Sequence, residues 1–411
     1  MGLEALNRFL VGGAVRDKVL QLEVTDRDWV VVGSTPEEML DLGLAPVGKD
    51  FPVFIDKTSG EEYALARTER KISQGYTGFS FHASPEVTLE QDLQRRDLTI
   101  NAMAETPSGE IIDPFGGLQD LENGVLRHVS PAFVEDPVRI LRVARFAARF
   151  GFTIAAETQQ LMTEMVANGE VDALVPERVW QEMVKALETD APQQFYISLR
   201  DCGALARILP EIDNLFGVPQ TATYHPEIDT GIHTMMVIEQ AAKLTDDKLV
   251  RFAALVHDLG KAVTPKEVLP SHRGHEAAGL PIIKNLCQRL RIPNKYQSLA
   301  LAVSEYHLHM HKMAELKPST ILRVLEKTRT INNRARAEQI ATACIADARG
   351  RTGKEQTEYP QAQMFLDFQQ AASGVNAGAI AANEESAERI KEQIIAARIT
   401  AIKQQKHSNR A

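Results

Sequence analysis

The spacing of apolar residues along the chain changes character near residue 130. Before it, short β-branched runs at residues 29–33, 51–56 and 110–114 are separated by glycine and proline, a pattern typical of a mixed α/β domain. From Ser130 onward the apolar residues recur every three or four positions, which indicates helices almost to the end of the chain. The sequence therefore predicts an α+β protein, with a mixed-sheet head followed by an all-α part.

Two interruptions divide the helical part. Proline, glycine and threonine break the pattern at residues 215–231 and again at 349–361, as expected for connecting loops. The last segment ends in an amphipathic helix with a polar end. We therefore expect four regions: a head at residues 1–130, a helical neck and body at 131–222, a histidine-rich helical domain at 223–350 and a helical tail at 351–411.

Composition narrows the class of protein without choosing a function. No apolar run approaches the roughly 20 residues of a membrane span, and the N-terminus lacks a signal-peptide pattern, so we expect a cytoplasmic protein without membrane contact. The net charge of −9 argues against indiscriminate nucleic-acid binding, although local basic stripes remain available. Cys202, Cys287 and Cys344 are too scattered for a disulfide framework and are expected in the core.

Two acidic residues open the apolar run near the N-terminus. Alternate residues of a strand face one side, so Asp26 and Asp28 are expected to project together and suit Mg²⁺. Alone, this pair is more typical of a solvated strand end. Upstream, however, Gly12 and Gly13 follow an apolar run and precede Arg16. Glycines at a strand-to-helix turn let backbone amides approach a phosphate, and an arginine can bind it bidentately. The combination favours a nucleotide site.

Residues 135–150 predict a helix with Asp136 as its N-cap and Pro137 in its first position. At about 100° per residue, its arginines fall within an arc of about 120°; they are Arg139, Arg142, Arg145 and Arg149. The simplest interpretation is a helix cap followed by a solvated stripe.

Most of the histidines lie in one region of the helical part. His233 is followed by the adjacent pair His257 and Asp258, then by His272 and His275, and finally by His307, His309 and His311. A single buried histidine is usually a core residue, but this density argues for a metal site. Mixed imidazole and carboxylate ligands suit Ni²⁺, Mn²⁺ or Co²⁺ better than Mg²⁺.

Six stretches, in this order, resemble the signature motifs of class II tRNA nucleotidyltransferases, the CCA-adding enzymes: LVGGAVRD, DRDWVVVGSTPEEM, EEYALARTERK, RRDLTINAMA, DPFGGLQDL and EDPVRILRVARFAARFGF. The histidine pattern resembles the HD superfamily of metal-dependent phosphohydrolases, so the match is closest to the bacterial multifunctional type that carries an HD domain. The resemblance implies a polymerase-β-like head, a neck and body, an HD domain and a helical tail. It also implies tRNA, CTP and ATP as partners.

For the head, the resemblance implies that Asp26 and Asp28 hold catalytic Mg²⁺ ions. A third carboxylate is expected at Glu62, which shares a strand face with Ala64, although the neighbouring Glu61 leaves this assignment open. The remaining nucleotide contacts that the resemblance implies are Gly13, Arg16 and Arg96 for the nucleotide and its phosphates, Asp136 and Arg139 for the edge of the base, and Arg142 and Arg145 for the phosphates.

For the HD domain, the resemblance implies a centre that activates water against a phosphoester, with Ni²⁺ or another transition metal. Its ligands would be His233, His257, Asp258, His275, His307 and Asp347. His309 lies off the helix face that His307 and His311 share and is expected to take no part. The implied activities are those of a 2′,3′-cyclic phosphodiesterase, a 2′-nucleotidase and a phosphatase.

Two alternatives stay open from the sequence. A bacterial poly(A) polymerase shares the head motifs but would neither add CMP nor stop after three residues. An HD phosphohydrolase with a vestigial head would not extend tRNA at all. The sequence also leaves open whether the chain forms a homodimer.

Overall fold

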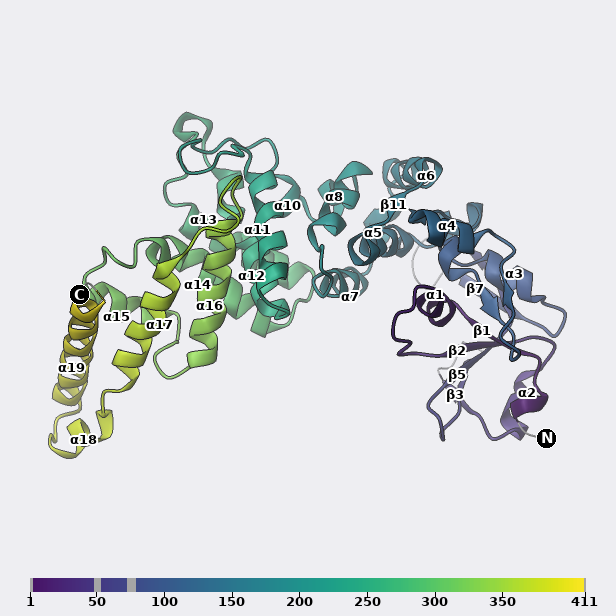
Figure 1. The fold of residues 1–411 in the computed structure, drawn as a ribbon, viewed down its shortest axis with the longest axis horizontal. Coiled ribbons are helices and arrows are strands. Elements are labelled where there is room, and N and C mark those ends of the chain that lie inside the picture. Colours follow the sequence, from purple (N-terminus) through teal and green to yellow (C-terminus); the bar gives the residue numbers. More distant parts are fainter. Residues whose placement is uncertain (1–2, 48–52, 72–78, 410–411) are drawn as a thin grey trace. The chain divides into compact units, whose positions relative to one another are not determined.

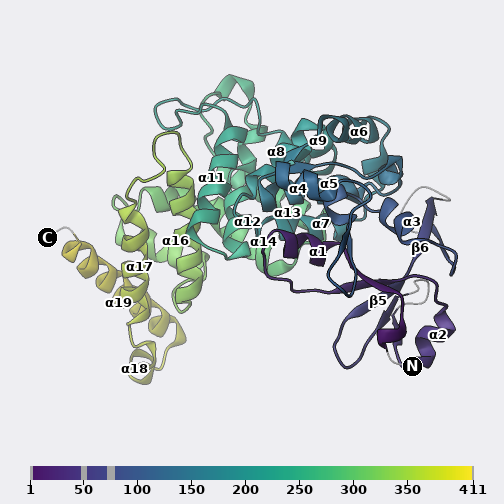
Figure 2. The same ribbon diagram turned by 45° about the vertical axis from the view of Figure 1, so that its right-hand side comes forward.

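The computed structural model describes residues 3–47, 53–71 and 79–409. The chain divides into two compact units (Figures 1 and 2). The N-terminal unit comprises Met1–Glu182 and Ile197–Ile208, and the C-terminal unit comprises Met183–Tyr196 and Leu209–Ala411. Each unit is treated by itself below.

The N-terminal unit contains the strands and the first helices. In chain order its main elements are β1 (Arg8–Val11), α1 (Gly13–Val19), β2 (Asp28–Val31), α2 (Pro36–Asp41), β3 (Ala45–Val47), β4 (Val53–Ile55), β5 (Glu62–Leu65), β6 (Arg67–Lys71), β7 (Phe79–Ala83), α3 (Leu89–Gln94), β8 (Ala104–Glu105), β9 (Ile111–Ile112), α4 (Gly117–Asn123), β10 (Val125–Leu126), α5 (Val138–Phe150), β11 (Thr153–Ile154), α6 (Ala156–Ala167) and α9 (Ala204–Ile208); α7 (Pro176–Ala186) and α8 (Gln193–Asp201) continue into the C-terminal unit. Short 3-10 turns are η1 (Leu3–Ala5), η2 (Thr99–Asn101), η3 (Pro131–Glu135) and η4 (Glu170–Ala173).

A mixed sheet organises this unit and confirms the predicted α+β head. In the described residues it has seven strands in the order β3-β4-β5-β2-β1-β8-β9, with β2 and β5 parallel and the other pairs antiparallel. Adjacent strand residues face opposite sides, so Val30 packs into one apolar cluster with Leu93 of α3, while Val31 packs into another with Met39 of α2. The predicted run at residues 51–56 forms β4 from Val53, and its first two residues lie outside the described ones.

The C-terminal unit is helical, as the sequence predicts. Its elements are α10 (Pro210–Asp213), α11 (Thr230–Leu244), α12 (Lys248–Val256), η5 (Leu259–Val263), η6 (Lys266–Val268), α13 (His275–Arg289), α14 (Asn294–His311), α15 (Pro318–Lys327), α16 (Arg334–Arg349), α17 (Pro360–Ser373), α18 (Ala377–Ala382) and α19 (Ala387–Ser408). The loops before α11 and after α16 fall at the two predicted interruptions, and α19 is the predicted final helix.

Helix α12 is the centre of this unit. It packs against α11, α14 and α16 (Figure 1), and the contact with α11 and α16 is made by small residues, since Ala254 meets Ala241 and Ala346. The run Val250–Val256 is buried throughout, which explains why all of its residues except Arg251 are apolar. The helix ends directly before His257, so a rigid element positions the first residues of the histidine-rich site.

Three further predictions can be compared with the fold. Helix α5 begins at Val138, one residue later than predicted, but the Asp136 carboxylate still accepts a hydrogen bond from the Val138 amide (3.0 Å), as a cap does. All three cysteines are free and buried, which confirms them as core residues. Among the described residues, every helix is too short or too polar to cross a lipid bilayer.

Candidate functional site

Four acidic residues of the head line one cavity of about 630 Å³: Asp26, Asp28, Glu61 and Glu62. Strand pairing brings them there: Asp28 lies opposite Glu62 of β5 on one side and Val11 of β1 on the other. Asp26 precedes β2 and is not part of it, so the prediction that both aspartates lie on the strand is wrong by two residues. It nevertheless lines the same cavity as Asp28 and Glu62. The register therefore places Asp28 between Glu62 and Val11, the residue that precedes the double glycine.

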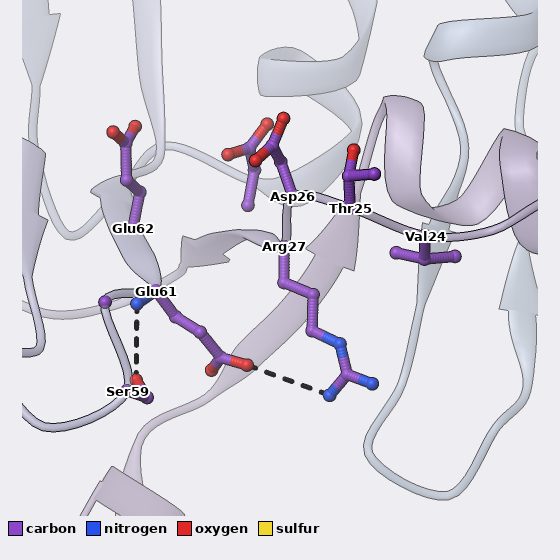
Figure 3. Close-up of a pocket in the computed structure, with 9 residues that line it drawn as sticks. Val24, Thr25, Asp26, Arg27, Ser59, Glu61 and Glu62 are labelled. Carbon is purple, nitrogen blue, oxygen red and sulfur yellow. Dashed lines mark hydrogen bonds and ion pairs between the residues drawn. The ribbon is translucent and has the colours of Figure 1, made fainter.

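Figure 3 shows that the two neighbouring glutamates, Glu61 and Glu62, point to different sides. The side chains of Glu62 and Asp26 extend to the same side, whereas Glu61 turns to the other side toward Arg27. Glu61 is held there by an ion pair with Arg27 (3.7 Å) and by a hydrogen bond from the Trp29 indole nitrogen (3.0 Å). Successive residues of a strand point in opposite directions, so Glu62 is the glutamate that faces Asp26, and Glu61 supports the strand.

The charge distribution of this cavity suits a cation. Burial by the cavity walls raises the pKa of Asp28, the Arg96 charge lowers it, and the Asp26 carboxylate raises it again. Like charges this close need a counter-ion, and hard carboxylate oxygens are ligands that Mg²⁺ prefers. The three carboxylates line one cavity without forming a compact triple, because the described triples with ligand atoms within 4.8 Å of one another all lie between residues 225 and 347.

The predicted phosphate-binding residues lie at the start of α1. Gly12 adopts a positive φ of 69°, which favours glycine, and a Cβ there would lie 2.7 Å from an Arg96 guanidinium nitrogen, so that side chain would have to shift. Arg16 is buried, donates to Asn101 Oδ1 (2.5 Å) and to Asp17 Oδ1 (2.8 Å), and lies over the Phe146 ring at 5.0 Å. Arg96 and Arg16 are thus placed against the glycine turn, each with protein partners already.

The predicted base-reading residues also have protein partners. The Asp136 carboxylate accepts two hydrogen bonds from Arg178 (3.3 and 2.8 Å). Arg139 is buried and donates to the backbone carbonyls of Ala132 (2.8 Å) and Arg95 (2.6 Å). The structure places Asp136 and Arg139 together at the start of α5 and adds Arg178, which the sequence did not single out.

The other arginines of α5 are paired with acids from distant parts of the chain. Their partners are Asp97 for Arg142 (2.6 Å), Glu182 for Arg145 (2.5 Å) and Asp17 for Arg149 (3.0 Å). Burial opposes ionisation of Asp97, but the Arg142 charge and hydrogen bonds from Asn101 and Arg142 outweigh it and lower the pKa of Asp97. The interpretation of this face as a solvated stripe is therefore wrong: it joins α5 to the head and to α7.

The histidine-rich site gathers all six predicted metal ligands in a buried cluster, each at most 6% exposed. These ligands are carried by α11, the residues directly after α12, α13, α14 and α16. In every histidine, Nδ1 donates to a backbone carbonyl: His233 to Gly350 (2.8 Å), His257 to Ala254 (2.7 Å), His275 to His272 (2.6 Å) and His307 to Ser304 (2.9 Å). This arrangement fixes the tautomer and leaves each Nε2 free to bind a metal.

The cluster consists of two adjacent triples, whose ligand atoms lie within 4.8 Å of one another in each. They are His233, His257 and Asp347, and Asp258, His275 and His307. Asp258 connects them, because Oδ2 lies 3.2 Å from His257 Nε2 while Oδ1 lies 3.2 Å from His275 Nε2.

Buried polar atoms without hydrogen-bond partners indicate that this cluster can hold a cation. Among the described residues, His233 Nε2, His257 Nε2 and Asp258 Oδ1 are buried without a hydrogen-bond partner. Unsatisfied buried polar atoms are costly, and a metal ion between two carboxylates and four imidazoles satisfies them. The donor set therefore fits a transition metal.

The sequence analysis predicted no role for four residues that surround this cluster. Glu227 Oε1 lies 3.1 Å from His233 Nδ1 and 3.1 Å from His225 Nδ1. His311 Nε2 contacts Asp347 Oδ2 (2.6 Å), and Tyr359 contacts His311 Nδ1 (2.8 Å). The shared helix face of His307 and His311 was the only sequence signal for any of them. His309 lies outside the compact triples, as expected.

Comparisons with known proteins decide the family. The chain is 57% identical to the multifunctional CCA protein of Laribacter hongkongensis, over 97% of this chain and 98% of the relative. It is 58% identical to the multifunctional CCA protein of Vibrio cholerae, over 96% and 98%. The chain belongs to the multifunctional CCA protein family.

The domain content of this multifunctional CCA family member agrees with that assignment. A poly A polymerase head domain matches residues 8–127, a probable RNA and SrmB-binding site of polymerase A matches 151–216, and an HD domain matches 230–348. The chain is therefore an enzyme with a nucleotidyltransferase head and an HD domain.

Solved structures share the fold of this family member at low identity. The Bacillus stearothermophilus CCA-adding enzyme, solved in complex with CTP, superposes with a TM-score of 0.65 at 22% identity, covering 97% of this chain and 89% of that one. The Thermotoga maritima CCA-adding enzyme, complexed with tRNA, gives 0.65 at 21% identity, covering 96% and 87%. These likenesses confirm the predicted fold class.

Proposed function

We propose that the head adds and repairs the 3′-terminal CCA of tRNA from CTP and ATP, without a nucleic-acid template and with release of pyrophosphate. The observation that carries this is the register that sets Asp28 beside Glu62 and beside the residue before Gly12. This register brings the cavity, which suits a cation, next to the glycine turn, which suits a phosphate. The relatives named multifunctional CCA proteins support the same activity.

In this mechanism Asp26 and Asp28 hold divalent cations, with Mg²⁺ as the proposed ion and Glu62 as the third carboxylate. When bound, such ions lower the pKa of the attacking hydroxyl and stabilise the leaving pyrophosphate. The backbone at Gly13 and the guanidiniums of Arg16 and Arg96 orient the triphosphate for in-line attack.

Base selection is proposed for Asp136 and Arg139. A carboxylate accepts from the amino group that cytosine and adenine both carry, and a guanidinium donates to the neighbouring ring acceptor. Because Arg178 holds Asp136 and two carbonyls hold Arg139, base binding must exchange these contacts for contacts with the nucleotide. Arg142 and Arg145 would assist at the phosphates only if they also exchange their acidic partners.

The test is incubation of tRNA that lacks its 3′ end with each nucleoside triphosphate, alone and together. Addition of two CMP residues and then a single AMP is expected, and Asp26→Ala should abolish both. Continued addition of AMP without CMP would identify a poly(A) polymerase. An Asp26→Ala variant that still extends tRNA would show that this cavity is not the active site.

We further propose that the HD domain carries a two-metal centre with 2′,3′-cyclic phosphodiesterase, 2′-nucleotidase and phosphatase activity. The two triples joined by Asp258 support two metal positions, and Ni²⁺ or another transition metal suits the imidazole-rich donors. Metal analysis of the purified protein should find up to two ions per chain. A strong chelator should remove phosphohydrolase activity, and His257→Ala should do so while leaving CCA addition intact.

The domain division that we propose remains the head at residues 1–130, the neck and body at 131–222, the HD domain at 223–350 and the tail at 351–411. We also propose that the enzyme acts in the cytoplasm, because its tRNA and nucleotide substrates are there. Cell fractionation checks the location, and light scattering during gel filtration checks whether the chain forms a homodimer.

A further inference from the structure

Three loops meet beside the histidine-rich centre, and we call residues 217–229, 263–272 and 350–353 the rim. Thr221 Oγ1 donates to the Pro270 carbonyl (3.4 Å), and the His272 imidazole contacts the Pro219 carbonyl (3.1 Å). The Thr352 amide donates to Glu227 (3.4 Å). The loops are therefore tied to one another and, through Glu227, to His233.

The rim brings partly exposed side chains close to the buried centre. The six candidate ligands are buried, whereas the side chains of Arg351 and His225 are 20% and 13% exposed. The His225 ring lies 4.6 Å from the His233 ring, centre to centre. A molecule that contacts the rim at His225 thus lies next to the proposed metal ligands.

Two cations lie on this side of the centre. The Lys261 ammonium lies 2.6 Å from Asp258 Oδ2 and donates to Gln220 (2.9 Å). Arg351 contacts Asp347 Oδ1 at 3.4 Å, while its Nε is buried without a partner in the described part of the chain. Nothing in nucleotidyl transfer uses these two cations, and an anion beside the proposed metal ligands would give Arg351 Nε a partner.

The rim is also rich in exposed apolar side chains. Five of the ten exposed large hydrophobic residues in the described part of the chain lie on it or at its edge: Tyr224, Ile228, Ile232, Val263 and Val268. Tyr224 is the most exposed of the ten, at 68%. It directly precedes His225, so its Cα lies about 3.8 Å from that of His225. An exposed aromatic ring beside a phosphate-suited site is the arrangement that binds single-stranded nucleic acid by stacking.

We propose that Arg351, Lys261 and Tyr224 form a subsite for the 3′-terminal nucleotide of RNA, in which the two cations hold the phosphate and the tyrosine stacks on the base. This inference rests on the proposed HD phosphohydrolase function and names its substrate class. A terminal nucleotide fits better than an internal one, because its base has a free face and its 2′ and 3′ oxygens are accessible. Stacking is tolerant of sequence, so the subsite accepts any terminal base.

The test compares a substrate that has a base with one that lacks it. Full-length, Ni²⁺-loaded enzyme is assayed with 2′,3′-cyclic AMP and with an abasic ribose 2′,3′-cyclic phosphate. Tyr224→Ala should raise KM for cyclic AMP about tenfold, the scale of one lost stacking contact, with little change in kcat. It should leave the abasic substrate unaffected. Tyr224→Phe should restore the wild-type KM, and Val268→Ala on the same rim serves as the matched control.

A second variant tests the phosphate half. Arg351→Gln should raise KM for both substrates, with the metal content per chain unchanged. If Tyr224→Ala leaves KM for cyclic AMP at its wild-type value, or harms both substrates equally, the subsite is refuted while the phosphohydrolase stands. If the metal-loaded wild-type enzyme hydrolyses neither substrate, the proposed HD function fails and this inference fails with it.

Discussion

Replacement of Gly260 by alanine is expected to move His275 away from Asp258 within the histidine-rich centre. A Cβ at residue 260 would lie 1.9 Å from the His275 carbonyl oxygen and 2.6 Å from the Gly279 amide nitrogen. Both are backbone atoms of α13, so no flexible side chain can yield. Relief to even 3.0 Å requires a movement of about 1.1 Å, the difference between 3.0 and 1.9 Å.

That movement is large for a metal site. Asp258 lies two residues before Gly260, and the added Cβ would clash with the backbone of His275. The ligand atoms of Asp258 and His275 are 3.2 Å apart in the wild-type structure. Metal–ligand distances tolerate only about 0.2 Å. We therefore expect Gly260→Ala to weaken metal binding by about 10–100-fold and to cost about 1–3 kcal/mol of stability through overpacking.

The assay is a metal titration in chelator-buffered solution, alongside hydrolysis of 2′,3′-cyclic AMP and CCA addition. A graded series supplies the controls: Gly279→Ala meets Ser304 Oγ at 3.0 Å and should be milder, whereas Gly378→Ala meets only Asn376 Oδ1 at 3.5 Å and should be neutral. CCA addition should survive in all three variants. Wild-type metal affinity in a folded Gly260→Ala protein would refute the reasoning.

The remaining predictions concern the N-terminal unit. Asp28→Asn should abolish CMP incorporation, measured on tRNA lacking its 3′ end, while hydrolysis of cyclic AMP continues. Glu62→Gln should lower nucleotidyl transfer far more than Glu61→Gln, because Glu61 faces Arg27; equal losses would contradict that assignment. Arg142→Ala leaves the buried Asp97 carboxylate without its ion pair and should destabilise the head by about 2–3 kcal/mol at pH 7. This loss is smaller than the loss from breaking a fully buried ion pair, because Arg142 is partly exposed. The fold lowers the pKa of Asp97, so this contribution is complete above the ordinary carboxyl pKa of 3.8 and is lost as the pH falls toward the folded-state pKa. Thermal unfolding measured from pH 7 down to about pH 2 should show a constant difference above the ordinary carboxyl pKa and a narrowing difference below it, and a difference that stays constant throughout would contradict the role of the ion pair.

Local patterns in the sequence were sufficient for the α+β division, the loop positions and the residue types of both sites. Strand alternation predicted that Asp26 and Asp28 project together, and the density of histidines predicted a metal site. The structure brings the acidic residues to one cavity and the histidines into one cluster. These inferences depend on spacing within one element or on chemistry that few residues supply. They fail by small amounts where an element begins, as at Asp26, because strand ends are set by pairing partners.

Tertiary structure alone decided which of several suitable side chains act together. The choice between Glu61 and Glu62 depends on the register of β5 against β2. The partners of the α5 arginines and the contacts of Glu227 and His311 join residues that lie far apart in sequence. A sequence states which charges exist, but ion pairs and ligand shells depend on distances of a few ångströms, and only the packing of elements against one another sets those distances.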